Sequence, residues 1–186
     1  FDQKQESLEP EQEPSDKNEL FHWILTLAIA VIIALCVNRF VLVNAEIPSG
    51  SMENTIMTGD RVFGNRLAYI FGEPKRFDII IFRYPDDEKQ LFIKRIIGLP
   101  GETVEIHDGQ IFIDGSKTPL KDVTTKEFMQ GSFGPYTVPD NCYFVMGDNR
   151  NNSKDSRYWE HTFVTDDEIV GKAFLRYWPL NKIKFL

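Results

Sequence analysis

The sequence predicts a mostly β protein, in which a compact antiparallel sheet or barrel-like domain follows one transmembrane helix. Two observations support this fold class. A long apolar run, Leu20 to Val43, lies near the N-terminus. The chain beyond it contains short apolar runs bounded by Gly, Pro and Asp, without the periodicity of a long amphipathic helix. The 186 residues suffice for one such domain and an anchor.

Residues 1–19 form an acidic segment ahead of the apolar run. They hold seven acidic side chains and two lysines, so they contribute −5 to the net charge of −7. Two prolines and few apolar residues accompany these charges. This composition is typical of a disordered, solvated tail.

The run from Leu20 to Val43 is expected to be a transmembrane anchor. Its 24 residues would span roughly 36 Å as a helix, against a hydrocarbon core of about 30 Å. The alternative is a cleaved signal peptide, because Val43-Asn44-Ala45 resembles a cleavage site. The acidic flank argues against it, since signal peptides begin with a basic region. Lys17 and Arg39 balance each other, so charge does not determine the orientation.

Residues 44–186 are expected to form the β domain. A hairpin is predicted over Thr103–Gly115, because Asp108-Gly109 favours a tight turn. The stretch from Lys117 to Pro139 is rich in Thr, Gly and Pro, and we expect an irregular excursion there. The other predicted strands include Val62-Phe63, Asp78–Phe82, Leu91–Ile97 and Tyr143–Met146.

Composition and missing motifs exclude several classes of function. No basic stripe is present, so nucleic acid is not an expected partner. Cys36 lies in the apolar run and Cys142 far from it, so both are expected to be free thiols. The chain has no H-E-x-x-H, no C-x-x-C, no phosphate-binding glycine loop and no dinucleotide fingerprint. No metal or organic cofactor is expected.

Two serines flank a glycine in IPSGSM, directly after the apolar run. If Ser49 or Ser51 attacks a carbonyl group, a base must accept its proton. The three histidines of the chain all lie far from this motif in sequence. No serine has a lysine three residues later, so the S-x-x-K arrangement is also absent.

Lys94 is the candidate base. The two-residue period of a strand places it on the same face as Phe92 and Ile96, with Arg95 on the opposite face. Burial among apolar neighbours would lower the pKa of the amine, whereas a guanidinium stays protonated. The alternative is a lysine at a sheet edge with its ammonium in water.

A polar segment, Met146–Trp159, follows a short apolar strand. Its Ser153 could bind an amine and orient it. Its charged side chains are expected to form a structural salt-bridge set, and the alternative is a polar surface turn. That set consists of Asp148, Arg150, Asp155 and Arg157.

The order of these segments resembles the bacterial type I signal peptidase (leader peptidase) family. The resemblance runs from about Leu20 to the C-terminus. It rests on these blocks: Ile47–Met52, Gly59-Asp60, Ile93–Arg95 with Gly98–Gly101, Gly147–Arg150 with Asp155–Arg157, and Ile169–Ala173 with Tyr177–Pro179.

The resemblance implies roles for individual residues. Ser51 would be the nucleophile and Lys94 its general base, a Ser–Lys dyad without histidine. The Ser51 backbone N–H and the Ser49 hydroxyl would form the oxyanion hole, while Ser153 would orient the Lys94 amine. Asp155 and Arg157 would hold the supporting loop. Ile47 and Ile93 would line shallow pockets for small substrate residues.

Three positions depart from the family pattern. Asn54 replaces a common proline, Val43–Glu46 replaces a Glu-Pro-aromatic run, and Glu160 replaces a common glycine. None belongs to the predicted dyad. Ala45 is expected to alter the substrate pockets.

The sequence is therefore interpreted as a membrane-bound serine endopeptidase that removes signal peptides from exported preproteins. Its partners would be these signal peptides and the lipid bilayer, with the catalytic domain on the outer face of the cell membrane. One rival is a self-cleaving repressor peptidase, which needs a DNA-binding domain where the anchor lies. Another is an inactive binding domain on a stalk, which would not need Ser51 and Lys94.

Overall fold

The computed structural model describes residues 16–122 and 127–186 and divides into two units, residues 1–38 and 39–186. The predicted acidic tail lies outside the described residues, apart from 16–19. The first unit contains the helix α1, Asp16–Cys36, and a π-helical turn follows at Val37–Val41. By length and composition, Glu19–Val41 could cross a membrane.

The limits of the apolar segment differ from those expected. The helix begins at Asp16, four residues before the predicted start. At the other end, Leu42 and Val43 belong to the strand β1, Leu42–Glu46. Val43 is buried and pairs with Gly64, so the sheet takes up the last two residues of the apolar run.

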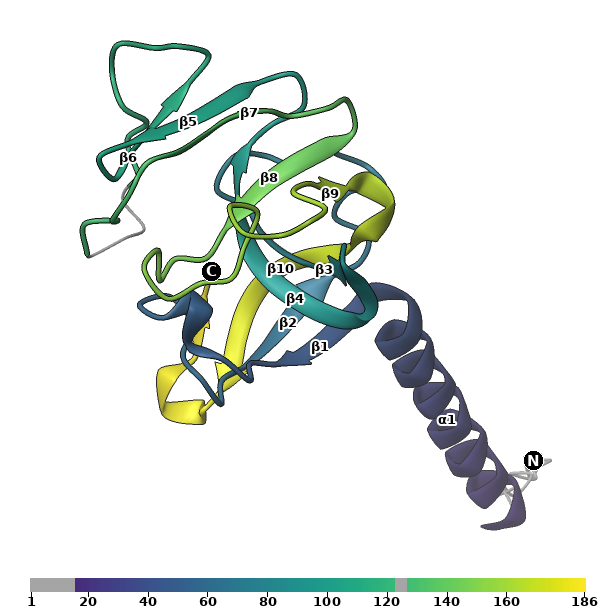
Figure 1. Ribbon diagram of the computed structural model, residues 1–186. Coiled ribbons are helices and arrows are strands. Elements are labelled where there is room, and N and C mark those ends of the chain that lie inside the picture. Colours follow the sequence, from purple (N-terminus) through teal and green to yellow (C-terminus); the bar gives the residue numbers. More distant parts are fainter. Residues whose placement is uncertain (1–15, 123–126) are drawn as a thin grey trace, which may run out of the picture. The chain divides into compact units, whose positions relative to one another are not determined.

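The second unit is built from two antiparallel sheets (Figure 1). The larger sheet has eight strands in the order β1-β2-β10-β3-β4-β8-β9, with β11 paired to β10. Besides β1, its strands are β2 (Arg61–Asn65), β3 (Ile79–Tyr84), β4 (Asp87–Gly98), β8 (Cys142–Met146), β9 (Val164–Thr165), β10 (Ile169–Trp178) and β11 (Lys184–Phe185). The expected mostly β, antiparallel fold is confirmed.

The smaller sheet has the order β6-β5-β7. The predicted hairpin is present as β5, Thr103–His107, and β6, Gln110–Ile113, joined by Asp108 and Gly109 with positive φ. The third strand, β7 at Phe133–Thr137, lies inside the segment for which an irregular course was expected. That expectation was wrong for these residues, because Tyr136 and Thr137 pair with β5 despite the Gly-Pro in the strand.

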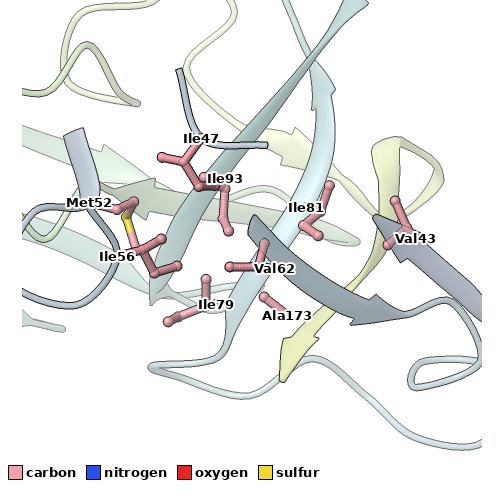
Figure 2. Packing of buried hydrophobic residues seen from close by; sticks show 9 residues of the cluster. All are labelled: Val43, Ile47, Met52, Ile56, Val62, Ile79, Ile81, Ile93 and Ala173. Carbon is pink, nitrogen blue, oxygen red and sulfur yellow. The ribbon is translucent and has the colours of Figure 1, made fainter. Parts of the chain in front are cut away.

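One buried cluster supports the chain segment that carries the two serines (Figure 2). Met52 and Ile56 have no exposed surface and pack with residues of the larger sheet. Burying a side chain of this size stabilises the fold by about 1.5–3 kcal/mol. The complete cluster is Val43, Ile47, Met52, Ile56, Val62, Ile79, Ile81, Ile93 and Ala173.

Candidate active site

Ser51 lies in a single 3-10 turn, Gly50–Met52, which we call the nucleophile turn. The next residue, Met52, anchors the turn in the core, while Ser51 itself is 9% exposed. The approach to the turn is held by hydrogen bonds from the Ile47 N–H to the Asp60 carbonyl and from the Gly59 N–H to the Ile47 carbonyl. The backbone on both sides of Ser51 is therefore fixed, by these hydrogen bonds before it and by Met52 after it.

Lys94 reaches Ser51 from the interior of the larger sheet. Its Nζ lies 2.7 Å from Ser51 Oγ, within hydrogen-bond distance. Its strand β4 pairs with β3 on one side and β8 on the other. Lys94 is only 4% exposed, so this structure excludes the alternative of a lysine at a sheet edge with its ammonium in water.

The surroundings of Lys94 favour its neutral form. The Phe92 ring centroid lies 5.4 Å from Nζ, on the face of β4 where the sequence places it. Burial lowers the pKa of the amine to about 8, although the negative charges of Asp155 and Asp148 act in the opposite direction. Desolvation lowers the pKa because it penalises the charged form, and here it outweighs the attraction of the two carboxylates. The amine can therefore be neutral near physiological pH.

Two other predicted residues lie close to Ser51. Ser49 Oγ is 3.4 Å from Ser51 Oγ, and Ser49 is exposed. Ser153 is buried, and its hydroxyl has no hydrogen-bond partner among the described residues. The expected bond from Ser153 to Lys94 is therefore not formed here, and its role in orienting the amine stays a prediction.

The four charged residues of the polar segment do not form a single set. Asp155 pairs with Arg157, two positions away in the sequence, at 2.8 Å. Arg150 pairs instead with Asp122, with a distance of 2.5 Å between Nη2 and Oδ2. These pairs are buried, so the alternative of a polar surface turn does not apply to them.

Asp148 pairs with Arg95, a partner that the sequence analysis did not identify. The contact is bidentate, at 2.7 Å and 2.6 Å, and Thr55 donates a further hydrogen bond to the same carboxylate. Arg95 also donates to the Phe77 carbonyl. The one available signal was that Arg95 faces away from Lys94, toward the opposite side of β4. This pair joins β4 and the loop after β8 to Thr55, just beyond the nucleophile turn.

A cleft of about 480 Å³ opens over the two reacting groups. Ile47 and Ile93 lie in its lining, and so does Ala45, the position that departs from the family pattern; that the two isoleucines form substrate pockets stays a prediction. The complete lining is Ala45, Glu46, Ile47, Pro48, Ser49, Gly50, Ser51, Gln90, Leu91, Phe92, Ile93, Lys94, Asn152 and Lys154. Such a groove can accept an extended peptide with small side chains.

Other features of this unit do not supply a competing site. A larger cleft, of about 690 Å³, lies beside Tyr69 and Tyr143, and no serine, lysine or histidine lines it. Within residues 16–122 and 127–186, no three Asp, Glu, His or Cys side chains gather as metal ligands would. Ser51 and Lys94 are therefore the candidate nucleophile and base.

Comparisons with a family model and with curated proteins point to the same family. A family model described as signal peptidase, peptidase S26, matches residues 20–178. A signal peptidase I of Leptolyngbya laminosa is 38% identical over 92% of this chain and 86% of its own length. A signal peptidase I of Bacillus licheniformis is 36% identical over 94% of this chain and 97% of its own length.

A solved structure of a signal peptidase I from Enterococcus faecalis is also similar. It is 37% identical in sequence and has a TM-score of 0.46. The match covers 54% of this chain and 96% of that chain.

Proposed function

The chain belongs to the signal peptidase family, peptidase S26, and from this premise we propose that Ser51 cleaves signal peptides from exported preproteins with Lys94 as its general base. The observation that carries the proposal is the 2.7 Å distance between Lys94 Nζ and Ser51 Oγ. A buried amine beside a hydroxyl is the arrangement that a Ser–Lys dyad requires.

In the first half-reaction, neutral Lys94 takes the Ser51 proton as Oγ attacks the scissile carbonyl carbon. The resulting tetrahedral intermediate carries a negative oxygen. The Ser51 N–H and the Ser49 hydroxyl donate hydrogen bonds to that oxygen, and one such donor contributes about 3 kcal/mol. Protonated Lys94 then gives its proton to the leaving amine, and the signal peptide stays attached to Ser51 as an ester.

In the second half-reaction, Lys94 acts as a base again. It takes a proton from water, which attacks the ester carbonyl, and then returns a proton to Ser51 Oγ as the signal peptide leaves. Proton transfer in both directions is efficient when the pKa of the base lies near the working pH. Burial places the pKa of Lys94 at about 8.

The cleft supports selection of small substrate residues. Ile47 and Ile93 line the cleft together with Ser51, and both are themselves almost fully buried. Because these two side chains are packed in the core, they cannot shift to accommodate a large substrate side chain. The residues that precede the scissile bond would therefore be small, as in Ala-x-Ala sites.

The apolar helix supports action at a membrane. The acidic segment would precede the anchor helix, and the peptidase domain, which begins with β1 at Leu42, would lie on the outer face of the cell membrane. The anchor would hold the enzyme in the bilayer that also holds the substrate's apolar segment. This raises the effective substrate concentration at the cleft.

A direct assay tests the function. The purified full-length protein in detergent is incubated with an exported precursor, and the new N-terminus is sequenced. Cleavage after a small residue at the end of the signal peptide supports the proposal, with Ser51→Ala as the matched inactive enzyme. Cleavage elsewhere, or equal cleavage by Ser51→Ala, contradicts it. An inactive binding domain would give no new N-terminus at all.

A further inference from the structure

Asn149, in the loop after β8, contacts the nucleophile turn at two points and Glu53, the next residue, at a third. Its backbone N–H donates to the Ser51 carbonyl at 3.1 Å. Its side-chain Nδ2 donates to the Gly50 carbonyl at 3.1 Å and to Glu53 Oε2 at 3.3 Å. Ninety-nine residues separate Asn149 from Gly50, so these bonds are tertiary contacts.

The chemistry of the three groups sets the orientation of the Asn149 amide. A carbonyl oxygen and a carboxylate only accept hydrogen bonds, so the NH₂ group must face both of them. Glu53 folds back over the turn, since a Cβ built on Gly50 would lie 2.5 Å from Glu53 Oε1. Glu53 thus binds the same Asn149 amide group that donates to the Gly50 carbonyl.

The Gly50 carbonyl and the Ser51 N–H belong to one peptide unit. That unit is planar and trans, so its C=O and N–H point in opposite directions. The first N–H groups of a helical turn have no acceptor inside the turn, and Ser51 is the second residue of this one. Fixing the Gly50 oxygen therefore also fixes the direction in which the Ser51 N–H points.

We infer that Asn149 is a positioning residue for the oxyanion hole. Its amide binds the carbonyl side of the Gly50–Ser51 peptide unit. The Ser51 N–H on the opposite side then points toward the oxygen of the tetrahedral intermediate. Glu53 supports it by binding the same amide. This inference rests on the proposed function, in which that N–H is an oxyanion donor, and it adds two residues to which no role has been assigned.

The role differs from general support of the loop. A loop brace would affect folding and the contact between Ser51 and Lys94. An oxyanion positioner acts on the transition state, because the oxygen becomes negative only there. Its loss lowers kcat while leaving KM nearly unchanged. It also leaves the pH midpoint of the acid limb unchanged, because that midpoint belongs to Lys94.

The test compares Asn149→Asp with Asn151→Asp in the full-length protein in detergent, using a peptide that spans a signal-peptide cleavage site. Asn149→Asp keeps the size and the backbone bond but replaces the donor by an acceptor. Asn151 lies in the same loop, and its amide bonds Phe128 and Gln130 instead. Asn149→Ala is the second variant, in case two facing carboxylates prevent folding.

We expect kcat of Asn149→Asp to fall by about 10- to 100-fold, somewhat less than for complete loss of an oxyanion donor. Its KM should match that of Asn151→Asp, whose kcat should stay within about twofold of the parent, and the acid-limb midpoint should be unchanged in the neutral variant Asn149→Ala. Glu53→Gln should lower kcat by only a few-fold, because the side-chain oxygen of the introduced glutamine can still accept a hydrogen bond from the Asn149 amide.

An unchanged kcat in folded Asn149→Asp and Asn149→Ala would overturn the inference. So would a fall in kcat of Asn149→Ala that comes with a shifted acid limb, since that places the defect in the dyad. Ser51→Ala distinguishes this failure from failure of the proposed function. If Ser51→Ala is inactive and Asn149→Asp is normal, only the role of Asn149 is wrong; if Ser51→Ala is active, the proposed site is wrong.

Discussion

Lys94 Nζ lies 2.7 Å from Ser51 Oγ, although 43 residues separate them along the chain. Neither His107 nor His161 competes as the base, because each is exposed and bonded elsewhere, to Glu105 and to Asp86. The buried amine is thus the basic group that lies within reach of the buried hydroxyl.

Substitution of the two serines separates the nucleophile from the oxyanion donor. Ser51→Ala should reduce cleavage by several orders of magnitude, because no other group can form the ester. Ser49→Ala should lower kcat by roughly 100-fold with little change in KM, as loss of one oxyanion donor does. Steady-state kinetics on a signal-peptide substrate measure both. Substantial turnover by folded Ser51→Ala would exclude Ser51 as the nucleophile.

Lys94 should determine the acid limb of the pH–rate profile. The rate should rise with pH around a midpoint near 8, the pKa to which burial lowers this amine, as its neutral form becomes populated. Lys94→Arg should be inactive although its charge is retained, because a guanidinium does not lose its proton at working pH. Activity in the arginine variant would require another base. The profile should be recorded on kcat/KM to report the free enzyme.

Lys94→Met should make the protein more stable at neutral pH. The pKa of Lys94 falls from 10.5 unfolded to about 8 folded, which at 1.36 kcal/mol per pKa unit corresponds to about 3 kcal/mol. The cost is fully present below pH 8, where both states are charged, and disappears above pH 10.5, where both are neutral. The stability of the parent should therefore approach that of the variant across this interval. Chemical unfolding at pH 7 and pH 10 measures the difference.

Gly147→Ala should displace the nucleophile turn. A Cβ at this position would overlap the Ser51 carbonyl oxygen and the Ser153 hydroxyl, and the first of these is backbone. We expect activity to fall by about 100-fold or more, since misplacement by 1 Å can cost that much. Gly72→Ala is the matched control, because its Cβ would make only an ordinary contact at 3.4 Å. Equal activity of the two variants would show that the approach of Gly147 to Ser51 is not needed.

The β domain should need Leu42 and Val43, which the sequence analysis assigned to the anchor. A fragment of residues 39–186 retains β1 and the Val43 side chain, which is 3% exposed. A fragment of residues 44–186 loses about 2 kcal/mol of apolar burial, which should lower its melting temperature by about 4–8 °C. Thermal unfolding of the two fragments measures this. Equal melting temperatures would mean that β1 contributes little.

Membership of the family was evident from ordered blocks of residues, and local chemistry was readable as well. The two-residue period of β4 placed Lys94 beside Phe92, and the Asp108-Gly109 pair marked a hairpin that the structure contains. Both features depend only on residues a few positions apart in the chain, so they can be recognised from the sequence. Strand β10 was missed because half-buried residues along most of its length give no clear alternation.

The sequence by itself determined which side chains could carry out the chemistry: two serines, a lysine without a neighbouring carboxylate, and an apolar segment long enough to span a bilayer. Only the tertiary structure decided which of them meet. Asp148 pairs with Arg95 and Arg150 pairs with Asp122, although Asp148 and Arg150 lie only two positions apart in the sequence. The physical reason is that a strand sets only the direction of its side chains, whereas partners are chosen by the pairing of strands distant in sequence. The same pairing buries Lys94 and so lowers its pKa.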